Sequence, residues 1–160
     1  MELLRINART TTCFYERKGI KVHSCGVVMG FLRVGGLRSI EFGTPGQMRD
    51  QLNSLIIDGN KRATAGLLKE DYLDEGEEIE FVGERLAILD NDQKSIGIVK
   101  ITRVEVLDFK DVSTEFALAE SEGDLSGDDF RQSHLEFWKS VGIDVYPDTK
   151  VVTVYFDLEK

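Results

Sequence analysis

The chain has 160 residues, the length of one ordinary domain, because either half alone would be too short to bury a large core. Hydrophobic residues make up 41% of it and charged residues 31%, a balance typical of globular rather than disordered or fibrous proteins. The formal net charge of −9 argues against strong sequence-independent binding to duplex nucleic acid, which needs many cationic contacts. A nucleic-acid ligand would have to be bound locally, as a nucleoside or an unpaired base.

The sequence carries no obvious signal for a membrane or for export. No apolar run approaches the roughly 18 residues that a membrane span needs, and residues 1–9 lack the apolar core of a secretory signal. Cys13 and Cys25 are the only cysteines, so the chain is not a disulfide scaffold. We expect a soluble cytoplasmic protein with no membrane partner.

Residues 1–39 show no single period. They contain β-rich fragments at 10–15 and 27–32 that glycines interrupt. These fragments are either edge strands added to the main sheet or part of an extension that begins before the domain proper. We predict an N-terminal extension over residues 1–39 and one domain over residues 40–160.

A helix is predicted over residues 45–58, with Thr44 as its cap, Pro45 in its first position and Gly59 after its end. Its apolar stripe, at helical spacing, consists of Met48, Leu52, Leu55 and Ile56. The face expected to meet solvent carries Arg49, Asp50 and Asn53.

Alternating segments follow and predict a sheet. Residues 78–81 alternate as in a strand whose glutamates face water, and residues 85–89 and 95–106 predict a hairpin around a turn at 90–94. The apolar set changes phase near Thr102 and Arg103, which indicates a β-bulge. Residues 152–158 alternate again and predict a closing strand in the same sheet.

Two further helices are predicted in the second half of the chain. A short one covers residues 113–119, and a longer one begins at Ser126, whose spacing from Asp129 fits a capping box, and stops at Gly142. The buried face of the longer helix is expected to consist of Phe130, His134, Phe137, Trp138 and Val141. Together these elements predict an α+β fold, a curved or closed antiparallel sheet flanked by helices.

The polar residues gather in two segments, at 58–66 and 120–124. Lys61 and Thr64 are three positions apart, so they share a face only if the chain turns between them. By spacing alone, the first segment is a solvated loop after a helix and the second an acidic loop whose charges favour the next helix. The functional alternative is a carboxylate of the second segment that turns inward to face Lys61, as an acid, a base or an orienting group.

Other arrangements of reactive residues are weaker. Cys13, His23 and Cys25 match no standard zinc spacing, and no glycine loop has a nucleotide-binding pattern, so we expect neither a metal nor another cofactor. His134 lies among apolar positions, which favours a hydrogen-bonded packing role over catalysis.

The order of these motifs resembles the ASCH domain, a superfamily named for activating signal cointegrator homology, and in particular its bacterial stand-alone branch. The similar runs are Glu-Phe-Gly at 41–43, Gly-Asn-Lys-Arg-Ala-Thr at 59–64, Thr-Arg-Val with a following Val at 102–106, Phe-Ala-Leu-Ala-Glu-Ser-Glu-Gly at 116–123, and Phe130 with His-Leu-Glu-Phe-Trp at 134–138. The resemblance covers about residues 40–158, most of the chain.

The resemblance implies a PUA-like β-barrel surrounded by helices, with a cleft beside the segment after the first helix. RNA or nucleotide-like ligands are expected to bind there. The residues that the resemblance places at this ligand are Lys61, Arg62, Thr64, Arg103 and Glu122. One bacterial group deacetylates N4-acetylcytidine with a Lys, a Thr and a Glu, which fall on Lys61, Thr64 and Glu122.

Such a trio is sufficient in kind for amide hydrolysis, because the lysine can act as a base, the threonine hydroxyl can attack a carbonyl and the carboxylate can orient protons. The deacetylase pattern has an Arg two residues after the Thr, however, where this chain has Gly66. We therefore consider a cleft that binds RNA or a nucleoside-like ligand first, and a nucleoside amidohydrolase second. A third hypothesis is an acidic module that binds a basic protein.

Overall fold

The structure is a computed structural model that describes residues 33–159 of the chain. The predicted fragments at 10–15 and 27–32, and the residues Cys13, His23 and Cys25, lie outside the described residues.

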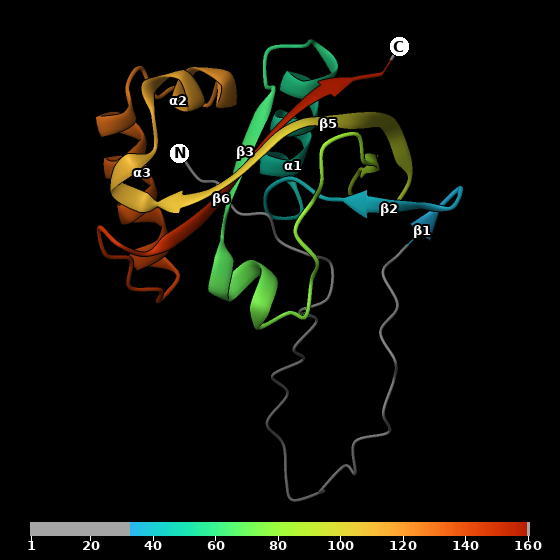
Figure 1. Cartoon of the computed structure of the whole chain (residues 1–160). Coiled ribbons are helices and arrows are strands. Elements are labelled where there is room, and N and C mark those ends of the chain that lie inside the picture. Colours follow the sequence, from blue (N-terminus) through green and yellow to red (C-terminus); the bar gives the residue numbers. More distant parts are fainter. Residues whose placement is uncertain (1–32, 160) are drawn as a thin grey trace, which may run out of the picture.

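Six strands form one sheet in the order β1-β2-β4-β5-β6-β3 (Figure 1). Their bounds are β1 Arg33–Val34, β2 Leu37–Ile40, β3 Ala63–Leu67, β4 Arg85–Leu89, β5 Ser95–Asp108 and β6 Lys150–Leu158. The pairing of β2 with β4 is parallel and the other four pairings are antiparallel. Residues 33–39 therefore belong to the sheet, although we had assigned them to the extension.

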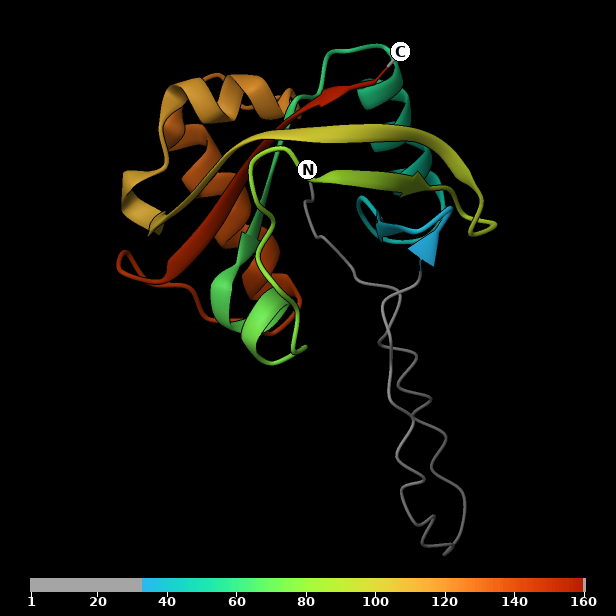
Figure 2. The same cartoon turned by 45° about the vertical axis from the view of Figure 1, so that its right-hand side comes forward.

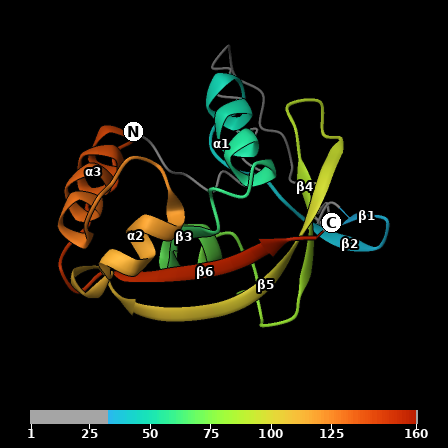
Figure 3. The same cartoon turned by 90° about the horizontal axis from the view of Figure 1, so that it is seen from above.

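The sheet is curved but open, with β1 and β3 at its two edges in the described part of the chain (Figure 3). Of the two alternatives predicted, curved or closed, the structure supports the curved α+β sheet and not a closed barrel. The edge strands explain this, because β1 has two residues and β3 has five before the chain turns into the π-helix η1 (Leu68–Leu73). No pairing joins β1 to β3 in the described part of the chain, so the sheet stays open there.

The helices cover two regions of the sheet. Helices α2 (Thr114–Glu120) and α3 (Gly127–Ser140) lie together at one end, after the short 3-10 helix η2 (Phe109–Asp111), whereas α1 (Gln47–Ile57) lies apart from them (Figures 1 and 2). Each region has its own apolar cluster. The first joins α2 and α3 to Ala63, Ala65 and Leu67 of β3, and the second joins α1 to β4, β5 and β6.

Helix α1 differs from its prediction at its start. It begins at Gln47 after Gly46, whose φ of 107° is outside the helical range, so Thr44 does not cap it. Instead, the carbonyl of Thr44 accepts a hydrogen bond from the Arg49 amide at 3.2 Å. The two glycines on either side of the Thr44-Pro45 pair have positive φ angles, a conformation that suits glycine and keeps these residues in a turn.

Two residues of α1 that were expected to be exposed are buried. The Arg49 guanidinium donates to the Glu41 carboxylate at 2.7 Å, and the Asn53 amide donates to the Leu89 carbonyl at 3.1 Å. A stripe of apolar residues alone does not reveal such burial, because the polar partners lie outside the helix, eight positions away for Arg49 and in β4 for Asn53. The predicted stripe itself is confirmed, with Leu52 and Ile56 in the core and Met48 and Leu55 packed against it.

The predicted strand at 78–81 is wrong, since these residues form an irregular segment. The expected burial is also reversed. Glu80 is buried and accepts a hydrogen bond from the Tyr72 hydroxyl at 3.1 Å, whereas Phe81 is exposed. An available hydrogen-bond donor in the interior outweighs the alternation of the sequence here.

The hairpin of β4 and β5, the bulge between Ile101 and Arg103, and both C-terminal helices are confirmed. Ser126 caps α3 by accepting from the Asp129 amide at 3.1 Å. Two further side chains, one after α3 and one on β6, differ from the exposure that the sequence pattern predicts. Val141 is exposed because α3 ends before it, and Thr153 is buried because the apolar clusters cover both faces of β6 at that point.

Candidate functional site

Lys61 lies in the short connection between α1 and β3, and its side chain is almost completely buried, with 1% of the residue exposed. The backbone is held on both sides. The amides of Asn60 and Lys61 both donate to the Leu55 carbonyl at the end of α1, and the Arg62 amide donates to the Ala119 carbonyl of α2. The segment is therefore not the solvated loop that spacing alone favours.

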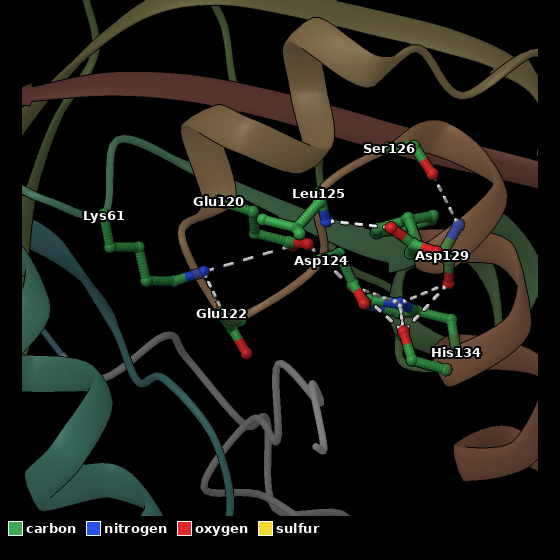
Figure 4. A network of polar contacts seen from close by, with 10 residues as sticks. Lys61, Glu120, Glu122, Asp124, Leu125, Ser126, Asp129 and His134 are labelled. Carbon is green, nitrogen blue, oxygen red and sulfur yellow. Dashed lines mark hydrogen bonds and ion pairs between the residues drawn. The ribbon is translucent and has the colours of Figure 1, made fainter.

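Glu122 reaches Lys61 from the turn that follows α2. Ser121 adopts the left-handed conformation with φ 58°, and Gly123 has φ 110°, so the chain reverses around Glu122. Its carboxylate accepts a hydrogen bond from the Lys61 ammonium and forms an ion pair with it (Figure 4). The inward-facing carboxylate that was the functional alternative for the acidic segment is thus present.

Glu120, at the end of α2, supplies a second carboxylate to the same lysine. Its Oε1 lies 4.0 Å from Lys61 Nζ, and 1% of the residue is exposed (Figure 4). Burial raises the pKa of Glu120 well above its ordinary value, although the nearby Lys61 opposes the shift. Burial also raises the pKa of Glu122, against the effect of Lys61. Sequence reasoning did not single out Glu120, although it lies within the predicted acidic segment.

His134 of α3 adjoins this cluster from the other side. Its Nε2 lies 3.8 Å from Glu120 Oε2, its Nδ1 lies 2.8 Å from the Phe130 carbonyl, and its ring stacks on that of Phe130 (Figure 4). Burial lowers the pKa of His134 to about 3, so the imidazole is neutral at physiological pH. The histidine packs in the core, as expected, and also faces the buried carboxyl of Glu120.

Thr64 occupies β3, where it pairs with Val154 of β6. Its neighbours Ala63 and Ala65 pack into the cluster of α2 and α3, so alternation along the strand places Thr64 on the opposite face. Among the described residues, no hydrogen bond joins its hydroxyl to Lys61 or Glu122. The structure thus brings Lys61 and Glu122 together but does not bond Thr64 to either.

A cleft of about 590 Å³ lies between α1 and the turn that carries Glu122. Its lining is formed by Gln47, Met48, Gln51, Leu52 and Leu55 of α1 and by Ser121, Glu122 and Gly123 of the turn. We call this hollow the α1 cleft. The buried ion pair of Lys61 and Glu122 therefore reaches its wall.

The other two predicted ligand contacts lie elsewhere. Arg62 is exposed and lines a second hollow of about 340 Å³ beside α2 and β6. Arg103 lies over the ring of Tyr155, which also lines this second hollow, and forms ion pairs with Glu105 and Glu115. The predicted set is therefore not gathered in one hollow, because Glu122 lines the α1 cleft and Arg62 lines the second hollow.

Gly66 stands two residues after Thr64, where the deacetylase pattern has an arginine, and its surroundings leave little room for a side chain. A Cβ atom at residue 66 would lie 3.1 Å from Asp71 Oδ2 and 3.2 Å from Tyr72 Cε2. The Asp71 carboxylate is held in place, because it accepts from the Leu67 amide at 2.6 Å. In this chain η1 takes the space into which a longer side chain would have to extend.

The sequence model that describes the ASCH domain matches residues 38–160 of the chain. This chain belongs to the ASCH domain family. The match begins near the start of β2 and includes both segments that meet at Lys61 and Glu122.

Solved structures agree with this family. An ASCH domain from Lactobacillus crispatus JV V101 is 30% identical, with a TM-score of 0.62 over 74% of this chain and 76% of that one. A protein from Enterococcus faecalis V583 is 29% identical, with a TM-score of 0.63 over 74% of each chain. A search of curated proteins found no match.

Two further observations concern the described part of this ASCH domain. Within residues 33–159, no three His, Cys, Asp or Glu side chains are grouped so that they could hold a metal ion. None of the described helices has the length and apolar character required to cross a bilayer.

Proposed function

We propose that this ASCH domain binds a nucleobase-containing ligand, either a free nucleoside or an unpaired base of RNA, in the α1 cleft. The observation that supports the proposal is the ion pair of Lys61 and Glu122, which is almost fully buried and reaches the wall of the cleft through Glu122. A buried ion pair adds little to stability after its desolvation cost. Perturbed charged groups in a cleft are more typical of a functional site.

The chemistry of the α1 cleft suits a base. Met48, Leu52 and Leu55 offer an apolar surface to the flat faces of the ring, while the carboxylate of Glu122, held by Lys61, offers an acceptor to its polar edge. The net charge of −9 means that affinity must come from these local contacts and not from attraction to phosphates.

Calorimetric titration with a panel of nucleosides and a short single-stranded RNA tests the proposal. Glu122→Gln keeps the shape of the side chain but removes its charge, so the affinity of the bound ligand should fall by about ten-fold or more. Glu136→Gln, an exposed glutamate on α3, serves as the matched control and should leave affinity unchanged. Equal affinity for all three proteins would contradict a site at Glu122.

Amide hydrolysis of an acylated nucleoside is the second candidate, favoured by the position of Lys61 between two carboxylates. Burial raises the pKa of Glu120, which favours a carboxyl that can carry a proton beside Lys61. Attack by the Thr64 hydroxyl on the acyl carbon would break the C–N bond, with a proton passing to the leaving amine, and water would then free the acid. The orientation of Thr64 and the absence of an arginine at residue 66 weigh against this candidate.

Incubation with N4-acetylcytidine and related acylated nucleosides, followed by chromatography, tests hydrolysis. We expect weak or no turnover of N4-acetylcytidine itself. If a substrate is turned over, Thr64→Val should abolish the reaction and Glu122→Gln should slow it. Turnover that survives Lys61→Ala in a folded variant would refute the assigned mechanism, and binding without turnover favours the plain binding domain.

A further inference from the structure

Two side-chain amides border the α1 cleft without bonds of their own. Gln47 and Gln51 are four residues apart on α1, so they lie on the same face of the helix, and both line the cleft. Both residues are exposed, and neither side-chain amide forms a hydrogen bond within the described part of the chain. Each amide can donate and accept at once.

The α1 cleft offers no free cation among its described lining residues. Its single charged member is Glu122, whose carboxylate is already bound by Lys61. Arg62 lines the second hollow, Arg103 lies over Tyr155 beside it, and Arg49, although it is in α1, is buried against Glu41. A phosphate in this cleft would lack a positive partner and would lie near carboxylates.

An uncharged ring with an amide-like edge fits this lining better. Such an edge presents a carbonyl beside an N–H or amino group, and a glutamine amide can bond both at once. The cleft volume of about 590 Å³ falls within the range of small-molecule sites. Met48 and Leu52 supply the apolar contact for the faces of the ring.

From these observations we infer that the α1 cleft selects an uncharged nucleoside over its phosphorylated form, and that Gln47 and Gln51 determine this specificity by bonding the edge of the base. The inference rests on the proposed function, because it names the ligand class of the same cleft. It assigns the two glutamines a role that the predicted set of Lys61, Thr64 and Glu122 did not include.

The test is calorimetric titration of the full chain with cytidine, uridine and cytidine 5′-monophosphate. At least one nucleoside should bind about ten-fold or more tightly than the monophosphate. Gln47→Leu and Gln51→Leu should each weaken nucleoside binding by about ten-fold, the effect of losing a hydrogen bond. Gln132→Leu, an exposed glutamine on α3, is the matched control and should change nothing.

A variant that adds a positive charge gives a second test. Gln51→Lys places a cation at the rim of the α1 cleft and should shift the preference toward the monophosphate. If wild type binds the monophosphate as tightly as the nucleosides, or if both leucine variants bind like wild type, the inference is overturned while the proposed function stands. If a short single-stranded RNA binds but no nucleoside does, the inference also fails. If no probe binds at all, both proposals fail.

Discussion

Oε2 of Glu120 faces Nε2 of His134 at 3.8 Å in the interior of the protein, and neither atom has a hydrogen-bond partner among the described residues. The ring proton of His134 must be on Nδ1, which lies 2.8 Å from the Phe130 carbonyl, so Nε2 is an acceptor. Two acceptors face one another unless Glu120 carries a proton. The raised pKa of Glu120, caused mainly by burial, agrees with a neutral carboxyl.

Glu120→Gln should flatten the dependence of stability on pH. A glutamate whose pKa is raised on folding stabilises the protein fully below its unfolded pKa, near 4.5, and this contribution is lost as the pH rises through the folded pKa. The free energy of unfolding of wild type should therefore fall as the pH rises above about 4.5, and fall less in the variant. Urea unfolding at several pH values measures both slopes.

The amide of the variant is neutral and keeps the shape of the side chain, so the fold should be retained. Glu115→Gln, on the exposed side of the same helix, is the control and should leave the slope as in wild type. Parallel curves for wild type and Glu120→Gln would show that Glu120 is ionised in the folded protein.

Lys61→Met should destabilise the protein by about 3 to 5 kcal/mol, because it leaves the buried carboxylate of Glu122 without its ammonium partner. Adding Glu122→Gln to this variant should restore part of the loss, since no ionised group then remains unpaired at that position. A double-mutant cycle, measured by urea unfolding at pH 7, gives the coupling energy of the pair. Additive effects of the two substitutions would mean that the contact contributes nothing to the folded state.

Gly66→Ala should destabilise the protein by about 1 kcal/mol or more, because its methyl group meets the fixed carboxylate of Asp71. Gly97→Ala is a matched comparison on β5, where the nearest atoms are ends of flexible side chains at 3.4 Å or beyond. That substitution should be neutral or slightly stabilising. Thermal unfolding of both variants checks the difference, and an equal Tm for the two would contradict the crowding at residue 66.

Random duplex DNA should not bind detectably at physiological salt, because the chain carries a net charge of −9. Fluorescence anisotropy with a labelled duplex of arbitrary sequence, repeated at low salt, is the measurement. Tight binding that weakens steeply with added salt would contradict this expectation and indicate a cationic surface.

The sequence by itself determined the elements whose signals are local. The cap at Ser126, the turn between β4 and β5 and the bulge near Arg103 depend on residues a few positions apart, so their patterns are visible in one dimension. The resemblance to the ASCH domain, now shown, also follows from the order of motifs along the chain.

Only the tertiary structure decided which charged side chains are buried and which of them meet. Lys61 and Glu122 are 61 positions apart, and no local pattern distinguishes their contact from a solvated loop. Glu80 and Arg49 were expected at the surface for the same reason, since the partners that satisfy them lie on other elements. A buried charge depends on groups brought together by folding, and therefore neither the role of Glu120 nor the division of the predicted site between two hollows could be predicted from spacing.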